Sequence, residues 1–363
     1  MKKIAVITTY PENGTQNIGD QLITDSLISI LKKQQPNSEV MSFWREESYT
    51  NIKEKIESAS AVVFACLAIR PNFAKEEYPY IEDVIESGIP IYIISSGTSL
   101  DVSGITDLDS YLNDRSKEVL RKLDDKAVHF GIRGALSYKF LKNMGLKNIQ
   151  HTGDVAFYSE SYLGKKFEKP KKVNNIVISD PHRAIAYRKS FLELIKQLKT
   201  NFPLAELTVA LHGKNEVIES LCLKEGIRFS SIYRDKKAGL EIYDNADLHI
   251  GYRVHAHVST LKRRKISYLL EQDGRGCDYG LSLPVKLTVP NYQRLLSEVD
   301  YNFVFDLVRY KSKQLLKQAP ITDVKIMMSL LMLDYEIGFS KFTNLDVAID
   351  QVCDTIFDAL DGI

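Results

Sequence analysis

The sequence predicts an α/β protein with two doubly wound, Rossmann-like domains that face each other across a cleft, followed by C-terminal helices. Short apolar runs alternate with segments of helical periodicity, which is typical of parallel sheets covered by helices. The 363 residues exceed the usual size of one domain. A polar, basic linker at 163–172 interrupts the alternation. We therefore predict an N-terminal domain at 1–165, a C-terminal domain at 172–300 and a helical tail at 301–363 that packs back on both.

The first half contains alternating strand and helix signals. A loop at Pro11–Asn17 follows the first strand, and a turn at Ser95–Ser99 follows the fourth. Gly145 ends the last helix of this half, as glycine commonly does. The predicted strands are Ile4–Thr9, Glu39–Trp44, Ala61–Ile69, Ile89–Ser95 and Ala127–Ile132. The predicted helices are Gly19–Lys33, Ile52–Ser58, Tyr78–Ser87, Glu118–Leu123 and Ala135–Met144.

The second half repeats this pattern after the linker. From about Asp306 the periodicity is helical throughout and ends in a helix at Leu345–Leu360. The predicted strands are Asn175–Ser179, Leu207–Leu211, Ile227–Ile232, a run that ends at Gly251-Tyr252, and Ile266–Leu270. The predicted helices are Phe191–Leu198, Val217–Leu223, Leu240–Tyr243 and Val254–Arg263.

Composition excludes several classes of protein. The net charge of +1 gives no bulk attraction to nucleic acid. No apolar run approaches the length of a membrane span, and the apolar N-terminal run is too short for a signal peptide. Scattered cysteines suit a reducing compartment, so we expect a cytoplasmic protein. The cysteines are Cys66, Cys222, Cys277 and Cys353.

The segment Tyr252–Thr260 is the strongest candidate site. It joins a buried strand to a helix and places Arg253, His255 and His257 at a tight turn. In a parallel sheet such turns lie at the carboxyl edge, where ligands bind, and a helix start offers N–H groups to an anion. Arg253 adds a fork for phosphate or carboxylate, and His255 titrates near neutral pH. A structural role for these side chains stays open, whereas a metal site is disfavoured because residues two apart on a helix do not face each other.

Four short motifs, in this order, carry a resemblance to a known family. They are Asn17-Ile-Gly-Asp20, Gly131-Ile-Arg-Gly-Ala-Leu-Ser137, Gly153-Asp154 and Tyr252-Arg-Val-His255. In these the chain resembles the polysaccharide pyruvyl transferases over most of residues 1–285. The resemblance implies a glycosyltransferase-B-like fold. It also implies an enzyme that transfers the pyruvyl group of phosphoenolpyruvate, as a cyclic ketal, onto a sugar of a cell-surface glycan or its lipid-linked precursor. No cofactor or metal is expected.

The resemblance also implies roles for individual residues. His255 matches the catalytic position and would protonate the donor. Arg253 and Arg133 would bind the donor's phosphate and carboxylate. Asp20 would orient or deprotonate a sugar hydroxyl. Further substrate-binding residues would be Asn17, Gly19, Ser96 and Gly97.

Several alternatives stay open. Asp20 fits a helix N-terminus equally well, Arg133 fits a surface ion pair, and Asp154 fits a turn. We expect Lys262–Lys265 to form a solvated helix end. Arg70 stands where many relatives have a glycine-rich turn, and the loop His182-Arg183 directs cationic groups toward the predicted cleft without an assigned role.

Two rival functions remain at this point. One is a glycosyltransferase of the same fold that uses a nucleotide sugar, and the other is a non-catalytic glycan-binding or assembly protein. As partners we expect phosphoenolpyruvate and a glycan or lipid-linked sugar acceptor, with no nucleic acid and no integral membrane segment. Peripheral association with the inner face of the membrane stays open.

Overall fold

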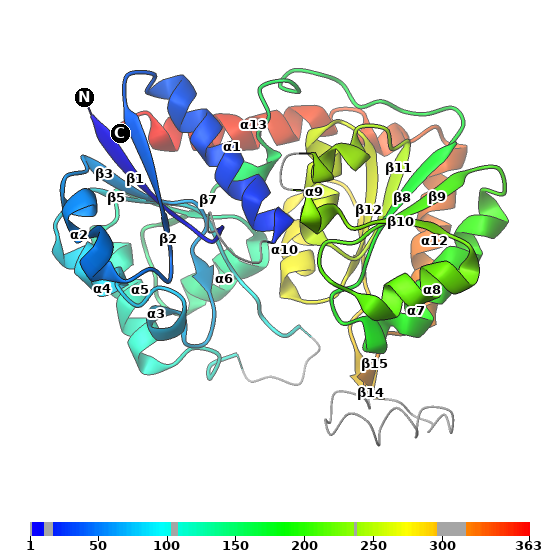
Figure 1. Cartoon of the computed structure of the whole chain (residues 1–363), viewed down its shortest axis with the longest axis horizontal. Helices are drawn as coiled ribbons and strands as arrows, with labels where there is room; N and C mark the ends of the chain where they lie inside the picture. Colours follow the sequence, from blue (N-terminus) through cyan, green and yellow to red (C-terminus); the bar gives the residue numbers. More distant parts are fainter. Residues whose placement is uncertain (1, 11–16, 103–107, 236–237, 296–316) are drawn as a thin grey trace.

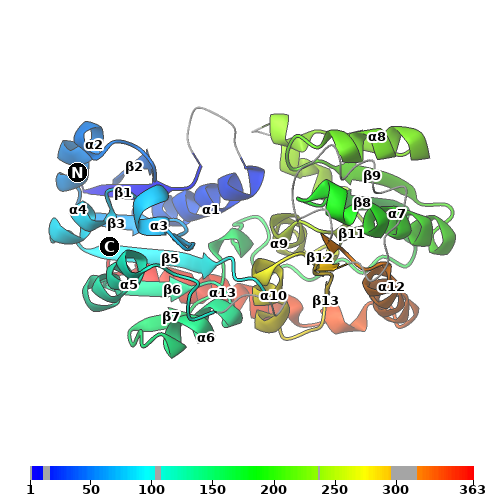
Figure 2. The ribbon, with the colours of Figure 1, turned by 90° about the horizontal axis from the view of Figure 1, so that it is seen from below.

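The computed structural model describes residues 2–10, 17–102, 108–235, 238–295 and 317–363. Two parallel sheets lie beside each other, each covered by helices, and the C-terminal helix runs back from the second sheet to the first (Figures 1 and 2). This arrangement confirms the predicted fold class. Most of the predicted loop at Pro11–Asn17 and the predicted start of the helical tail at Asp306 lie outside the described residues.

The first sheet has seven strands in the order β2-β1-β3-β5-β6-β7, with β4 pairing beside β5. From β1 the chain moves outward to β2 and then crosses to β3 on the other side, which creates a topological switch point between β1 and β3. The strands are β1 Lys3–Thr8, β2 Glu39–Trp44, β3 Ala61–Phe64, β4 Ala68–Ile69, β5 Ile91–Thr98, β6 His129–Ile132 and β7 Ile149–His151. The helices are α1 Ile18–Gln34, α2 Tyr49–Glu57, α3 Phe73–Glu76, α4 Ile81–Glu86, α5 Asp114–Lys126, α6 Ala135–Asn143 and the 3₁₀ turn η1 Val155–Phe157.

The second sheet has six parallel strands in the order β10-β9-β8-β11-β12-β13. Its switch point lies between β8 and β11, so the loops after these two strands are adjacent. The strands are β8 Asn175–Ser179, β9 Glu206–Ala210, β10 Arg228–Ser230, β11 Leu248–Gly251, β12 Ile266–Glu271 and β13 Thr288–Pro290. The helices are α7 Ala184–Asn201, α8 Glu216–Glu225, α9 Val254–Lys262 and α10 Gly274–Ser282, with 3₁₀ turns η2 Ile232–Arg234 and η3 Gly239–Tyr243.

The C-terminal segment joins the two halves. The helix α12 (Ile321–Glu336) packs on α7, β12 and β13, and α13 (Leu345–Leu360) crosses to α1 and η1 after the 3₁₀ turn η6 (Ser340–Phe342). The Gln34 side chain on α1 donates a hydrogen bond of 2.8 Å to the carbonyl of Phe357. In the part of the chain that the structure describes, no helix is both long and apolar enough to span a bilayer.

The predicted single strand Ala61–Ile69 is wrong, because the chain forms two strands there. β3 ends at Phe64, and the short β4 pairs with β5 only. The buried hydroxyl of Tyr78 fixes the break: it donates to the Cys66 carbonyl at 2.7 Å and accepts from the Ala68 amide at 3.1 Å. A side chain distant in sequence therefore satisfies the backbone groups that strand pairing leaves free.

The predicted turn at Ser95–Ser99 is also wrong, because β5 continues to Thr98. A register shift between Ile93 and Ser96 bends the strand, with Ser95 at a φ of 58°. The bent strand then pairs with β4 through Gly97. The segment Ser95–Ser99, which predicted a turn, thus contains a β-bulge instead.

One further element was not predicted, and one further prediction is wrong. The segment after β12 forms the helix α10, whose start Asp273 caps by accepting from the Arg275 amide at 3.0 Å. The tail is not helical throughout, because β15 (Lys317–Gln318) pairs in antiparallel fashion with β14 (Arg294–Leu295). Both elements are short, and tertiary contacts rather than periodicity define them.

The run Lys262–Lys265 is not a solvated helix end. Arg263 and Arg264 are 8% and 2% exposed. Arg264 forms an ion pair with Asp350 on α13 and donates to the carbonyl of Lys165 in the linker. The cations at this helix end therefore tie the linker, α9 and α13 together.

Candidate active site

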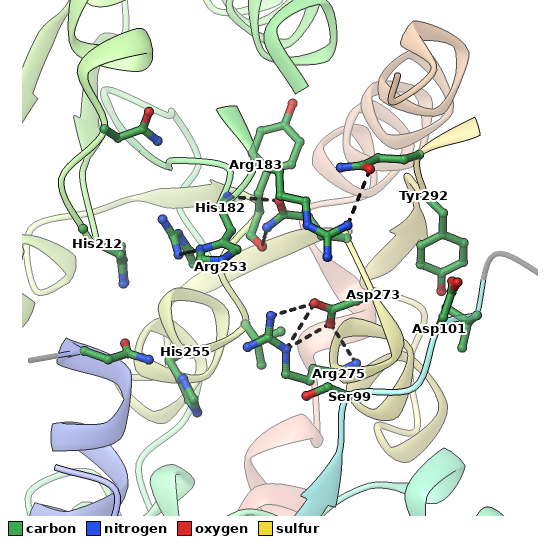
Figure 3. A pocket seen from close by; sticks show the side chains of 18 of the residues that line it. Ser99, Asp101, His182, Arg183, His212, Arg253, His255, Asp273, Arg275 and Tyr292 are labelled. Carbon is green, nitrogen blue, oxygen red and sulfur yellow. Dashed lines mark hydrogen bonds and ion pairs between the residues drawn. The ribbon is translucent and has the colours of Figure 1, made fainter. Parts of the chain in front are cut away.

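A cavity of about 1260 Å³ lies between the two sheets, and both contribute to its lining. Its residues follow the carboxyl ends of strands from each half, among them β4, β5 and β6 in the first sheet and β8, β9 and β11 in the second. Figure 3 shows their side chains pointing into this space. Parallel sheets bind ligands at this edge, and the β8/β11 switch point adjoins it. This cavity is the candidate active site.

The cavity concentrates positive charge in a protein whose net charge is only +1. Basic side chains greatly outnumber the acidic ones among its lining residues. The basic ones are Arg70, Arg133, Arg183, Lys214, Arg234, Arg253, Arg275 and Lys317, and the acidic ones are Asp101 and Asp273. Such a field favours a ligand with several negative charges.

His255 lies in the first turn of α9, on the side of the cavity next to α1 (Figure 3). Its ring packs so closely on Gly19 that a Cβ there would lie 2.2 Å from Nδ1. Nε2 is buried and has no hydrogen-bond partner among the described residues. Burial lowers the pKa of His255 to about 4; Asp154 opposes this shift, whereas Arg133 and Arg275 add to it. The imidazole of His255 is therefore neutral at pH 7.

Arg133 follows β6 and reaches the cavity from the first half. It is 7% exposed, its Nε has no hydrogen-bond partner within the described ranges, and Nη2 donates to the Thr98 carbonyl at 3.4 Å. Gly97 makes room for it, since a Cβ there would lie 2.4 Å from Nε. Burial by itself would lower the pKa of Arg133, but nearby groups including Tyr279, Cys66 and Asp278 raise it above its ordinary value. It forms no ion pair with any described residue, so it is not the surface ion pair of the alternative interpretation.

Arg253 is the N-cap residue of α9, and Asp180 holds most of its guanidinium. Nε donates to Oδ1 of Asp180 and to its backbone carbonyl, both at 3.0 Å, and Nη2 donates to Oδ2 at 2.9 Å. Asp180 is fully buried. Burial alone would raise the pKa of Asp180, but Arg253, His212 and Asn215 lower it overall. Nη1 lies 3.3 Å from Nδ1 of His182, which lines the cavity. The guanidinium group that was predicted to bind a phosphate or carboxylate is therefore largely occupied by Asp180.

Arg275 is a site residue that the sequence reasoning missed. It lies in the first turn of α10, where Nη2 donates to Asp273 at 2.6 Å (Figure 3). Its charge acts on both His255 and Asp20. Because it follows β12 at the carboxyl edge of the sheet, its position after a predicted strand was the available signal. Arg133 and Arg275 are thus the cations whose charges act on His255.

Asp20 and Asn17 lie at the start of α1. Asn17 lines the cavity, and its side chain caps the helix by accepting from the Gly19 amide at 3.0 Å. Asp20 is therefore not the cap, and it stands behind the residues that line the cavity. Burial raises the pKa of Asp20, and the charges of Arg45 and Arg70 partly oppose this.

Other predicted residues have structural roles. Ser96 is fully buried and donates to the Leu67 carbonyl at 2.9 Å, so its hydroxyl does not reach the cavity. Asp154 caps η1 and accepts a hydrogen bond from Tyr279 of α10, which links the two halves. Arg70 lines the cavity and pairs with Glu77 at 3.1 Å.

A series of buried hydrogen bonds supports the turn at Arg253. His257 and His249 each bond the Ser267 hydroxyl at 2.7 Å, and His249 also bonds the Ser179 hydroxyl at 3.0 Å. The Ser179 oxygen accepts from the amide of Arg253 at 3.1 Å. His257 is thus a structural residue. Across the described ranges, no group of three or more His, Cys, Asp or Glu side chains is arranged to hold a metal ion.

Solved structures of low sequence identity share the fold. The Anabaena protein HepE, in complex with UDP and glucose, is 10% identical, with all of both chains covered and a TM-score of 0.55. A Listeria monocytogenes protein assigned as a UDP-N-acetylglucosamine 2-epimerase is 10% identical over 94% of this chain and 98% of that chain, with a TM-score of 0.50. These likenesses support the glycosyltransferase-B-like fold alone.

Sequence comparison identifies the family. No curated protein matches the chain. A family model described as polysaccharide pyruvyl transferase matches residues 17–262, which include Arg133 and the turn at Arg253–His255 and make up more than half of the sequence. The chain belongs to the polysaccharide pyruvyl transferase family.

Proposed function

We propose that the protein transfers the pyruvyl group of phosphoenolpyruvate onto two hydroxyls of a glycan sugar, as a cyclic ketal. One observation carries the proposal: Arg133 and Arg275 reach the cavity from opposite sheets, the charges of both act on His255, and Nε2 of His255 is buried without a hydrogen-bond partner among the described residues. Phosphoenolpyruvate carries a phosphate and a carboxylate on one small carbon frame. Guanidinium groups from two directions suit these two anions, and the imidazole is near enough to serve as a proton donor.

The chemistry needs one proton delivered to carbon and one phosphate released. His255 donates its proton to the donor's methylene carbon, which becomes a methyl group, and C2 becomes electrophilic. One sugar hydroxyl attacks C2, the C2–O bond to phosphate breaks, and the second hydroxyl closes the ring. Of the two hydroxyl protons, one restores His255 and the other leaves with phosphate. The products are the ketal and inorganic phosphate.

The donor itself would prepare His255 for this role. In the free protein the pKa of His255 is lowered to about 4, first by burial and then by the charges of Arg133 and Arg275. A bound phosphate and carboxylate would neutralise these charges and add negative charge next to the ring. The imidazolium is then favoured when the substrate to be protonated is present.

Asp20 remains our candidate for orienting or deprotonating an acceptor hydroxyl. Burial raises its pKa, which favours uptake of a proton from a hydroxyl, and Gly19 next to it contacts His255. We expect the acceptor to be a sugar of a cell-surface glycan or its lipid-linked precursor. We expect no cofactor.

A thermal melt with candidate ligands tests the donor. A donor at a hundred times its dissociation constant stabilises the folded state by about 2.7 kcal/mol. We expect phosphoenolpyruvate to raise the melting temperature, and UDP-glucose to leave it unchanged. Stabilisation by the nucleotide sugar alone would instead favour a glycosyltransferase.

A second experiment tests the proton donor. His255→Ala should lower turnover by roughly 10²–10⁴-fold, the usual range for general acid assistance, with a much smaller change in donor affinity. The exposed His151, which does not line the cavity, provides the matched control His151→Ala. Near wild-type turnover in folded His255→Ala would rule out the acid role.

A further inference from the structure

The cavity extends well beyond the three residues that the donor needs. Its volume of about 1260 Å³ exceeds the usual range of about 300–1,000 Å³ for sites that enclose a drug-sized ligand. In Figure 3, Arg183 and Tyr292 lie away from His255. Arg183 is not among the charges that most affect the pKa of His255. It does affect His182, whose pKa is lowered first by burial, then by the charges of Arg253 and Arg275, and then by the charge of Arg183. This second end of the cavity is cationic and unused by the proposed donor.

The start of helix α7 forms one wall of this end. Arg183 is its N-cap residue, no side chain among the described residues caps the helix by a hydrogen bond, and its first turn contains no acidic residue. The first intrahelical bond comes from the Tyr187 amide to the Arg183 carbonyl at 3.2 Å. The preceding amides are therefore not used within the helix and favour an anion, as at any helix start.

Gln293 provides an independent sign of a ligand. It lines the cavity, is only 9% exposed, and its Nε2 is buried without a partner among the residues that the structure describes. Its Oε1 accepts from Nη1 of Arg183 at 3.5 Å, which directs the amide NH₂ and the guanidinium to one region. A buried amide donor without an acceptor is costly unless a ligand supplies one.

The loop is held in place by its neighbours. The His182 amide donates to Oε1 of Gln272 at 3.0 Å, and Nε2 of Gln272 donates to the Tyr252 carbonyl at 2.8 Å. The Ala319 amide bonds the carbonyl of Ala186 at 3.0 Å, which places the segment after Lys317 against the first turn of α7. Lys317 also lines the cavity. The polar groups named here are thus donors on fixed elements; the acidic side chains of the cavity lining are Asp101 and Asp273, and Arg275 holds Asp273.

We propose that Arg183 and Gln293, with the start of α7 and Lys317, form a second anion subsite that binds an oxyanion attached to the acceptor sugar. The inference rests on the proposed function only in taking that sugar as the acceptor. The oxyanion is either a phosphate, as in a glycosyl phosphate or diphosphate, or the carboxylate of an acidic sugar. Both present oxygen acceptors to the same donors.

Isothermal titration of the full chain with glucose, glucuronate and glucose 1-phosphate tests the subsite, because the three share one ring and differ in the oxyanion. Each titration is made with and without phosphoenolpyruvate. We expect one of the two anionic sugars to bind about tenfold more tightly than glucose, under both conditions. Whichever binds more tightly identifies the source of the oxyanion.

Variants localise the effect. Arg183→Ala and Gln293→Met should each weaken binding of that anionic sugar, the former by about tenfold, the usual effect of losing a charged hydrogen bond. Arg188→Ala, an exposed arginine on the same helix outside the cavity, should leave it unchanged. The subsite would be overturned by any of three results. Glucose could bind as tightly as both anionic sugars, Arg183→Ala could bind the anionic sugar as the unaltered protein does, or phosphoenolpyruvate could displace that sugar.

Donor titrations on the same preparations keep the two proposals apart. Arg183→Ala should bind phosphoenolpyruvate as the unaltered protein does. If the donor fails to bind while an anionic sugar binds through Arg183, the proposed function fails and the subsite stands. If the donor binds and no anionic sugar is preferred, the subsite fails and the proposed function stands.

Discussion

Binding of phosphoenolpyruvate is expected to make the protein take up a proton at His255. In the free protein burial, together with Arg133 and Arg275, lowers the pKa of His255 to about 4, so the ring is neutral at pH 6. The bound donor would place a phosphate and a carboxylate against the same arginines. Their negative charge raises the pKa of His255, and the ring in the complex gains a proton from solvent.

The size of this coupling follows from the shift. A full return of the pKa from about 4 to the ordinary 6.5 would correspond to about 3 kcal/mol of binding free energy, or roughly 300-fold in affinity; this is the upper limit, because burial, the largest cause of the shift, persists in the complex. The sign is fixed by the two protonation states. Donor affinity increases as pH falls from about 6.5 to about 4, because only the complex is protonated in that window. Below about pH 4 the free protein is protonated too and the gain stops.

Calorimetry measures the proton directly. At pH 6, titrations in two buffers with different ionisation enthalpies give the number of protons taken up on binding. The phosphate of the donor also titrates near this pH, so His255→Gln is the control, and the difference between the two proteins is the contribution of the imidazole. We expect the unaltered protein to take up a larger fraction of a proton. Equal uptake by both proteins would refute the coupling and weaken the case for His255 as the acid.

Three further predictions concern the residues around this turn. Arg253→Ala should weaken donor binding by less than about tenfold, because Asp180 already holds most of the guanidinium; a loss of tenfold or more by titration would place Arg253 in the donor site. Asp180→Ala should destabilise the fold by about 3–5 kcal/mol, since it leaves Arg253 unpaired beside a buried site, and denaturant unfolding checks this. Gly19→Ala should displace His255 and lower turnover while the protein stays folded, whereas Gly362→Ala, where the nearest described contact of a Cβ is the Tyr92 hydroxyl at 3.5 Å, should not; equal turnover in both would contradict the close packing.

The local patterns of the sequence were sufficient for the fold class. Apolar runs and helical periodicity predict most strands and helices, because burial on a sheet or on one helix face constrains side chains within a few residues. The strand-to-helix turn at Arg253–His255 was located for the same reason, since it lies between a buried run and a helix. Features held by distant partners were missed. The break between β3 and β4 depends on Tyr78, and the burial of Arg264 depends on Asp350 of the last helix.

The candidate site shows the same division between sequence and tertiary structure. The sequence alone determined that cations and a histidine lie at the carboxyl edges of parallel strands, because strand polarity and short turns fix that edge. Only the tertiary structure decided which cations face a ligand. Asp180 holds most of Arg253 and Asp273 holds Nε and Nη2 of Arg275, whereas Arg133 forms no ion pair with a described residue; Arg133 and Arg275 line the cavity from opposite sheets. The ion pairs and the burial of these side chains depend on which loops the two sheets bring together. No local pattern of residues encodes that contact.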